Sequence, residues 1–472
     1  MRGGTTQSGL DLIPPDPVDL SPVFGVVDVE VASVSPIQML NSHVYVFVAA
    51  FLVTLLLTPL VRRLAVAGGA VDHPDAGRKT HRYPVASLGG LAVFFGVISA
   101  VAISYVGGGG GLAAAYPTVP LAIVIGMVVI TFTGLADDIW GWDPRLKIAG
   151  QFVAAAALAI ENVGVKVAAG ILGPVAVWLD PVLGSENLVF LVGTPWGSVS
   201  VDLIYWIGTA LIAVFVLGGC NAANLIDGLD GLLCGVVGIV AVGLLAISLL
   251  MVPGMDPSAT APSPMAGARI VLCLALLGAV LGFLPHNFNP ASIFLGDCGS
   301  LLLGYLCVVI IIMFGEQGQT HLVFAGLIVF SLPILDTALT ILRRWIAGTP
   351  MSAADDKHIH HRLKRILGGV KRAVLVLYGI SFLFAVVGVT LAALVVRTEL
   401  QVRVVYAIAL VLFGFIGVIA VKSALRQRVL SAGSLAEAQQ KQEPPSRPAN
   451  AGSRDPGDGG EGPPPEPKAS SS

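Results

Sequence analysis

Long apolar runs recur along this chain from residue 44 to residue 421. A helix of about 20 predominantly apolar residues can cross a bilayer, and a helix satisfies its own backbone polar groups there. The composition is 55% hydrophobic and only 12% charged. This pattern predicts an all-α polytopic integral membrane protein with about 11 transmembrane helices. The predicted spans are Val44–Leu60, Leu88–Val106, Val119–Ala136, Ile148–Ile160, Leu203–Gly219, Leu232–Val252, Ile270–Leu284, Leu301–Phe314, Leu322–Leu342, Val374–Val396 and Val402–Val421.

Both ends of the chain differ in composition from the membrane domain, which we place at residues 44–421. Residues 1–43 are rich in proline, with scattered acids and almost no basic residues, and residues 422–472 are rich in Gly, Pro and Ser. Such segments cannot bury enough apolar surface to fold. We therefore expect a disordered extracytoplasmic tail at 1–43 and a disordered cytoplasmic tail at 422–472.

The cysteines and the net charge argue against two classes of site. All five cysteines lie in or beside apolar runs and none belongs to a C-x-x-C motif, so we expect neither zinc nor a disulfide framework. The formal net charge of −2 gives no reason to expect a nucleic-acid partner.

Lysine and arginine are distributed unevenly between the loops, which predicts the orientation in the membrane. Most of them follow the first and ninth spans or open the C-terminal tail, whereas the alternate loops hold only Lys166, Arg269, Arg397 and Arg403. We therefore expect a plasma-membrane protein with its N-terminus outside and its C-terminus in the cytoplasm.

Residues Val163–Val201 could form either one more crossing, at Val165–Leu179, or an extracytoplasmic hairpin. The segment Asn187–Val201 is rich in β-formers and contains T-P-W-G as a turn signal. We favour the hairpin, because an extra crossing would place Asp138 and Asp227 on opposite faces of the membrane.

The stretch Asn221–Leu232, N-A-A-N-L-I-D-G-L-D-G-L, lies between two apolar runs. Its amides and carboxylates recur every third residue, at Asn221, Asn224, Asp227 and Asp230. Polar residues at a membrane boundary are costly unless they are satisfied or functional. Their oxygens suit Mg²⁺ and the ribose or phosphates of a nucleotide. The alternative is a helix-capping turn, in which Asn, Asp and Gly are common.

Four further polar clusters fall on the predicted cytoplasmic face. They contain Lys79; the pair Asp137 and Asp138; Asn287, Asn289 and Asp297 in H-N-F-N-P-A-S-I-F-L-G-D-C-G-S; and His358, His360, His361 and Arg362 in H-I-H-H-R. Adjacent carboxylates disfavour joint ionisation, so the aspartate pair predicts a nearby cation such as Mg²⁺ or Lys79. Its alternative is a solvated helix end, and that of Asp297 is a helix N-cap.

The histidine cluster is better suited to phosphate than to zinc. His358 and His361 would share a helix face, and Arg362 adds a phosphate-binding guanidinium. A zinc site needs further ligands. Asp336, inside the predicted ninth span, has a simpler explanation as the partner of an arginine.

These motifs, in this order, resemble those of the polyprenyl-phosphate N-acetylhexosamine-1-phosphate transferases of the glycosyltransferase family 4 type. The motifs are D-D, N-x-x-N-L-I-D-G-L-D-G-L, F-L-G-D-C-G-S, P-I-L-D-T and H-I-H-H-R, spread over residues 44–421. The last motif is similar to that of the undecaprenyl- or decaprenyl-phosphate N-acetylglucosaminyl-1-phosphate transferase branch. Peptidoglycan translocases typically have three consecutive histidines, and Ile359 interrupts that run here.

The resemblance implies transfer of N-acetylglucosamine-1-phosphate from UDP-N-acetylglucosamine to a decaprenyl or undecaprenyl phosphate, with release of UMP. It implies Mg²⁺ as cofactor, with Mn²⁺ possible, and a polar cytoplasmic cleft. The catalytic residues it implies are Asp137, Asp138, Asp227 and His358; the substrate-binding residues are Lys79, Asn221, Asn224, Asp230, Asn287, His360, His361 and Arg362; the metal ligands are Asp297, Asn224 and Asp227.

Three alternatives stay open. Within the family, the donor could be another UDP-N-acetylhexosamine, or the reaction could be phospho-N-acetylmuramoyl-pentapeptide transfer. In a different class, the chain could be a transporter or flippase, but it shows no internal repeat and its acids lie at one face rather than at the bilayer midplane. A homodimer is a possible assembly.

Overall fold

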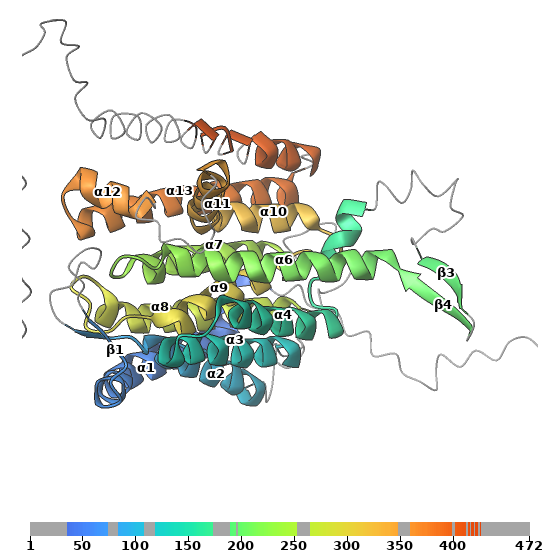
Figure 1. The fold of residues 1–472 in the computed structure, drawn as a ribbon. Coiled ribbons are helices and arrows are strands. Elements are labelled where there is room, and N and C mark those ends of the chain that lie inside the picture. The colour runs from blue at the N-terminus through green and yellow to red at the C-terminus, as the bar shows by residue number, and fades with distance from the viewer. Residues whose placement is uncertain are drawn as a thin grey trace, which may run out of the picture.

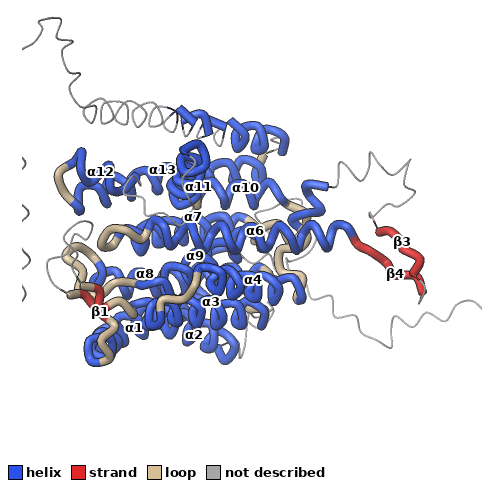
Figure 2. Tube along the Cα trace, viewed as in Figure 1, coloured by secondary structure: helices blue, strands red, loops and turns tan. Residues whose placement is uncertain are grey.

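The computed structural model describes residues 35–73, 84–107, 119–172, 189–194, 197–252, 265–347, 359–398 and 402–411, with a few residues between 414 and 425. Figures 1 and 2 show a bundle of roughly parallel helices with two small pairs of strands. The helices are α1 Pro36–Ala67, α2 Gly89–Gly107, α3 Leu121–Trp140, α4 Pro144–Ile160, α6 Leu203–Ile226, α7 Leu232–Leu250, α8 Ala266–Asn287, α9 Gly296–Met313, α10 Thr320–Val329, α11 Ser331–Ala347, α12 Ile359–Leu367 and α13 Val370–Arg397.

Eight helices in the described part of the chain are long and apolar enough to cross a membrane, or nine if the bent pair α10 and α11 is one span. The molecule is therefore a polytopic, mostly helical membrane protein. Every described helix that meets this test overlaps a predicted span. The other two predicted spans fall on α4 and on Val402–Val411, which are shorter, so the predicted number of 11 is not confirmed.

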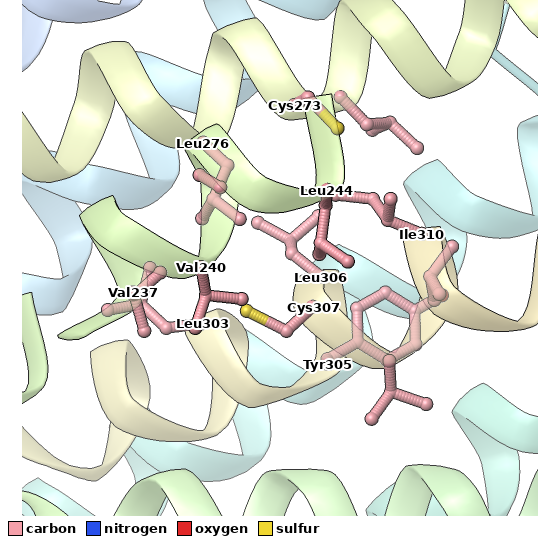
Figure 3. Close-up of a cluster of buried hydrophobic side chains, with 14 of the residues drawn as sticks. Val237, Val240, Leu244, Cys273, Leu276, Leu303, Tyr305, Leu306, Cys307 and Ile310 are labelled. Carbon is pink, nitrogen blue, oxygen red and sulfur yellow. The ribbon is translucent and has the colours of Figure 1, made fainter. Parts of the chain in front are cut away.

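Helix α9 lies at the centre of the bundle. Every residue from Cys298 to Met313 is buried, and α9 packs against α2, α3, α6, α7, α8 and α10. A helix that is apolar all round is expected at such a position. Lipid tails are as apolar as leucine, so close van der Waals packing must supply much of the association energy. Figure 3 shows this packing between α7, α8 and α9, with Val240, Leu244, Cys273, Leu276, Leu306, Cys307 and Ile310 among the labelled side chains.

The predicted ninth span, Leu322–Leu342, is not one straight helix. The structure divides it into α10 and α11, which meet at an angle of 79°. Pro333 explains the break, because proline lacks an N–H and its ring clashes with the carbonyl four residues earlier. That carbonyl belongs to Val329, the last residue of α10. The bend sends α11 across the bundle, where it packs against α6 and α13.

The two pairs of strands lie at opposite ends of the bundle (Figure 1). Strand β3, Val189–Thr194, pairs antiparallel with β4, Gly197–Asp202, which confirms the predicted hairpin. At the other end, β1, Val71–Asp72, pairs with β2, Val85–Ala86. The loops that follow α3, α6 and α8 lie at this same end of the bundle, so the polar motifs that they carry are close together.

Candidate active site

A cavity of about 680 Å³ opens at the β1 end of the bundle. Its walls come from the end of α1 and β1, the end of α3, the loop between α6 and α7, and the loop that leads into α9. Its size falls within the range of small-molecule sites. Asp138, Asn224, Asp227, Asp230, Asn287 and Asp297 all line it, so residues far apart in the sequence form one site. Asp138 and Asp227 share this cavity, as is expected if no extra crossing separates them.

The first turn of α9 depends on a carboxylate from α3. Asp138 Oδ1 accepts the backbone N–H of Asp297 at 2.8 Å, and its Oδ2 accepts that of Cys298 at 3.0 Å. The first N–H groups of a helix have no partner within the helix, so Asp138 caps α9 from another element. Gly296 precedes them with φ +73°, and a Cβ there would lie 2.3 Å from the Ser87 carbonyl and 2.6 Å from Asp138 Oδ2. This turn therefore needs glycine.

Lys147 was not among the residues predicted from the sequence. Its Nζ lies 2.7 Å from Asp137 Oδ2 and 2.6 Å from Asp297 Oδ2, so it joins the two carboxylates. The structure thus places a lysine from the first turn of α4 beside Asp137, whereas the sequence predicted Mg²⁺ or Lys79 there; Lys79 lies outside the described residues. Pro144 begins this helix and Asp143 caps it by accepting the Arg145 N–H. A lone lysine in an apolar helix next to D-D was the available signal.

The two adjacent aspartates have different surroundings. Both oxygens of Asp138 accept backbone N–H groups, whereas Asp137 faces the Lys147 ammonium. Because successive residues of a helix point about 100° apart, the two cannot share one position. The geometry separates a helix cap, Asp138, from a carboxylate paired with a lysine, Asp137.

The two asparagines of the N-x-x-N motif at the end of α6, Asn221 and Asn224, have different partners. Asn224 Nδ2 donates to Asp297 Oδ1 at 2.8 Å and to Ser300 Oγ at 2.9 Å. Asn221 instead donates to Gln151 Oε1 at 3.0 Å and to the Leu217 carbonyl, and it does not line the cavity. The predicted role of Asn221 in substrate binding stays a prediction, and the structure places it in a contact between α6 and α4.

Two residues that line the cavity, Asp230 in the loop between α6 and α7 and Asn287 at the end of α8, are held by hydrogen bonds. Asp230 Oδ2 accepts from Asn289 Nδ2 at 2.8 Å and from the Ala291 N–H at 3.1 Å. Asn287 is buried; it accepts the Gly231 N–H and donates to the Ile293 carbonyl. These bonds tie the α6–α7 loop to the segment that leads into α9.

Asp227 lies within electrostatic reach of three other carboxylates of the site. Burial, together with the charges of Asp297, Asp138 and Asp230, raises the pKa of Asp227 to about 8. Bringing a cation close would favour its ionised form.

The donors of the cavity fit a magnesium ion by their chemistry, because carboxylate and amide oxygens are its usual protein ligands. Within the described residues, no group of three or more His, Cys, Asp or Glu side chains is placed so that it could hold a metal by itself. Magnesium sites of nucleotide enzymes use one or two carboxylates together with substrate phosphates and water. Asp297 and Asp227 supply that number.

The histidine cluster is only partly described. His360 lies in α12 and is 2% exposed, so it is not a surface ligand. Arg362, also in α12, is exposed, and α12 includes His361, whose side chain is not described. His358 lies just before α12 and Lys79 lies between β1 and β2, both outside the described residues.

The fold and the site together define a class of protein: a membrane-spanning helical protein with an acidic cavity at one end, in which the lining residue Asp297 is paired with a lysine. The model of glycosyl transferase family 4 matches residues 120–315. A Bacillus subtilis protein named "Probable undecaprenyl-phosphate N-acetylglucosaminyl 1-phosphate transferase" is 32% identical over 352 residues, which cover 74% of this chain and 84% of that protein.

Two further relatives extend the comparison. The decaprenyl-phosphate N-acetylglucosaminephosphotransferase of Mycolicibacterium smegmatis is 33% identical over 351 residues, which cover 70% of this chain and 77% of that protein. The phospho-N-acetylmuramoyl-pentapeptide-transferase of Desulforudis audaxviator is 29% identical over 354 residues, which cover 72% of this chain and 95% of that protein. The chain belongs to glycosyl transferase family 4. This confirms the family that the motifs indicate.

Proposed function

We propose that this protein transfers N-acetylglucosamine-1-phosphate from UDP-N-acetylglucosamine to a polyprenyl phosphate and releases UMP. The product would start a lipid-linked glycan of the cell envelope. Support comes from relatives whose names include this transfer, at 32% and 33% identity. The observation that carries the proposal is the cavity lined by residues of the D-D, N-x-x-N-L-I-D-G-L-D-G and G-D-C-G-S motifs. One of these residues, Asp297, is paired with Lys147.

The proposed reaction is a displacement at phosphorus. An oxygen of the lipid phosphate forms a bond to the phosphorus that carries the sugar, the bond from that phosphorus to the bridging oxygen breaks, and UMP leaves with the electron pair. Both reactants are anions, so their repulsion makes up much of the barrier. Lys147 can exchange its carboxylate partners for phosphate oxygens and so reduce this repulsion.

We favour direct attack by the lipid phosphate. The second pKa of a phosphate monoester is about 6, so at pH 7 the nucleophile is already mostly dianionic. It needs an oriented position more than a strong base. Asp137, held by Lys147, is suited to orienting that phosphate or accepting its remaining proton. Asp138 instead keeps the first turn of α9, and with it Asp297, in place.

Magnesium would neutralise charge on the pyrophosphate and on the departing UMP. Asp297 and Asp227 would hold it, with Asn224 beside them. Asn224 already donates to one oxygen of Asp297, which orients that carboxylate toward the cavity. The oxygen donors that line the cavity support this assignment.

The proposed site lies at the cytoplasmic surface of the plasma membrane. The helix ends near the cavity carry most of the described basic residues, including Arg62, Arg63 and the arginines and lysines of α12 and of the first turn of α13, as the positive-inside rule expects. Trp140, at the cavity end of α3, is 63% exposed, as an interfacial aromatic would be. A lipid phosphate in the cytoplasmic leaflet would then be at the depth of the cavity.

The test is to incubate the purified protein in lipid vesicles with polyprenyl phosphate, Mg²⁺ and radiolabelled UDP-N-acetylglucosamine. The expected result is a labelled lipid and an equal amount of UMP, both lost when lipid acceptor or metal is omitted. UDP-N-acetylgalactosamine and UDP-N-acetylmuramoyl-pentapeptide serve as competing donors. A labelled lipid formed only from one of these would replace the proposed donor, and transport without UMP release would contradict the proposal.

A further inference from the structure

Asp336 is a buried carboxylate on α11 that the reaction proposed above does not use. Its side chain is 1% exposed. Its Oδ1 accepts the backbone N–H of Ile359, the first residue of α12, at 2.9 Å. Its Oδ2 lies 3.7 Å from Nδ1 of the equally buried His360. A carboxylate beside the first N–H of a helix is favourable for both charge and hydrogen bonding. Asp336 therefore connects α11 with the first turn of α12.

His360 in turn lies against the loop between α6 and α7. A Cβ on Gly228 would be 2.2 Å from His360 Nε2, so the imidazole packs directly on the backbone at that glycine. Gly228 follows Asp227, and the segment Asp227–Asp230 forms part of the cavity wall. Asp336, His360 and Gly228 thus form one continuous contact from α11 to the cavity.

This contact is made possible by the bend before α11. The 79° change of direction after α10 sends α11 across α6, and Asp336 lies on the redirected segment. A straight span would continue in the direction of α10 instead.

We propose that Asp336 is a positioning residue. It holds α12 and His360 against Gly228, and it thereby fixes the loop that carries Asp227 and Asp230 in the cavity wall. The consequence for catalysis rests on the proposed function, whereas the mechanical link between Asp336 and the loop does not.

The main variant is Asp336→Asn. An asparagine keeps the shape and can still accept the Ile359 N–H, but it loses the carboxylate that faces His360. Asp202→Asn is the matched control, because Asp202 also accepts one N–H at a helix start, that of Tyr205 at 3.0 Å, at the hairpin end of the molecule. Gly228→Ala is an independent variant that displaces His360 from the other side of the contact.

Two measurements test the inference. The first is amide hydrogen exchange of peptides that span residues 226–232, which reports loop order without any assay of activity. We expect at least tenfold faster exchange in Asp336→Asn and in Gly228→Ala, and wild-type exchange in Asp202→Asn. The second is steady-state kinetics, in which we expect at least tenfold lower kcat/KM for the nucleotide sugar and an unchanged KM for the lipid phosphate.

The double variant separates positioning from general destabilisation. If both residues act through His360, Asp336→Asn combined with Gly228→Ala should lower kcat/KM little more than either change alone. Wild-type exchange of the loop in Asp336→Asn would overturn the inference, as would multiplicative kinetic effects. If Asp336→Asn does not fold, Gly228→Ala is compared with wild type instead. Loop hydrogen exchange and steady-state kinetics then test the positioning role in that variant. A wild-type protein without transfer activity would instead refute the proposed function, and loop exchange would still decide the positioning role.

Discussion

Lys147 shows how one side chain can change the chemistry of two acids. It lies within 2.7 Å of carboxylate oxygens of Asp137 and Asp297, which belong to different helices. The shared ammonium lies between the two carboxylates and offsets their mutual repulsion. Its ion pair with Asp297 places the ammonium beside the wall of the cavity.

Replacing Lys147 by methionine should lower kcat/KM on the order of 100-fold, because removing one preorganised donor to a developing anion typically costs this much. Lys147→Arg keeps the charge but changes its reach, so we expect an intermediate loss. UMP release at saturating lipid phosphate measures both. A methionine variant with more than one third of wild-type activity would exclude Lys147 from the reaction.

Asp297→Asn should keep the fold, since an asparagine oxygen can still accept from Asn224. It should lower activity on the order of 100-fold, because a neutral amide binds Mg²⁺ more weakly and metal charge stabilisation is worth several kcal/mol. The measurement is UMP release against Mg²⁺ concentration, with Asp202→Asn as a control. Near-wild-type turnover at limiting Mg²⁺ would remove Asp297 from the metal ligands.

Asp137 and Asp138 should respond differently to the same substitution. Asp138→Asn leaves one N–H of α9 without its acceptor, so we expect a loss of about 1–3 kcal/mol in stability and lower activity at every pH. Asp137→Asn should stay folded and retain a residual activity. That activity should rise through about pH 6 to 8, as the lipid phosphate completes its own ionisation. Melting temperatures and pH–rate profiles of the two variants test this.

The same experiment can reject direct displacement. A covalent mechanism would release one equivalent of UMP per enzyme without lipid phosphate. If wild type shows that burst and one of the two variants lacks it, an aspartate attacks phosphorus and our mechanism is wrong.

At the level of helices, the ends of α9 depend on charged residues from other elements. Asp138 caps its N-terminus, and the buried Arg269 of α8 donates to the carbonyl of Met313 at its C-terminus, at 3.2 Å. The signs match the helix dipole at both ends. The most buried helix of the bundle is therefore held by a carboxylate at the cavity end and a guanidinium at the other.

Arg269→Ala should destabilise the fold on the order of 3 kcal/mol, because it removes a buried charged donor and leaves its space empty. Arg269→Met fills more of that space with apolar atoms and should cost less. Thermal unfolding in detergent measures the difference. Equal melting of wild type and Arg269→Ala, or a greater loss in Arg269→Met, would contradict this role.

At the scale of the whole molecule, the cavity and the β3–β4 hairpin lie at opposite ends (Figure 1). If the bundle spans the membrane as proposed, they face opposite compartments. The five native cysteines are all buried, so introduced cysteines can be labelled over a low background.

Ala67→Cys, at the exposed end of α1, should react with an impermeant maleimide only from the cytoplasmic side. Ser198→Cys, exposed in the hairpin, should react only from outside. Intact cells compared with inverted vesicles distinguish the two. Labelling of both positions from one side would overturn the topology.

Apolar runs by themselves predicted a polytopic helical protein. Only a helix, which pairs its own backbone N–H and C=O groups, or a closed barrel can cross lipid, and the runs have the lengths of helices. The motif residues Asp138, Asn224, Asp227 and Asp297 were likewise recognised, because amides and acids are costly at a membrane boundary. The bend between α10 and α11 was missed, since an uninterrupted apolar run does not show that Pro333 ends one helix and redirects the next.

Only the tertiary structure assigned partners to these residues. The sequence predicted Mg²⁺ or Lys79 beside the D-D motif, and the fold places Lys147 of α4 next to Asp137. The tertiary structure also gives Asp138 a different role from Asp137, since Asp138 caps α9. It places Asn221 outside the cavity, where it donates to Gln151. The physical reason is that composition and local periodicity determine which segments are helices. Which polar atoms meet depends on long-range packing angles and on the few ångströms between neighbouring helices, and no local pattern encodes those distances.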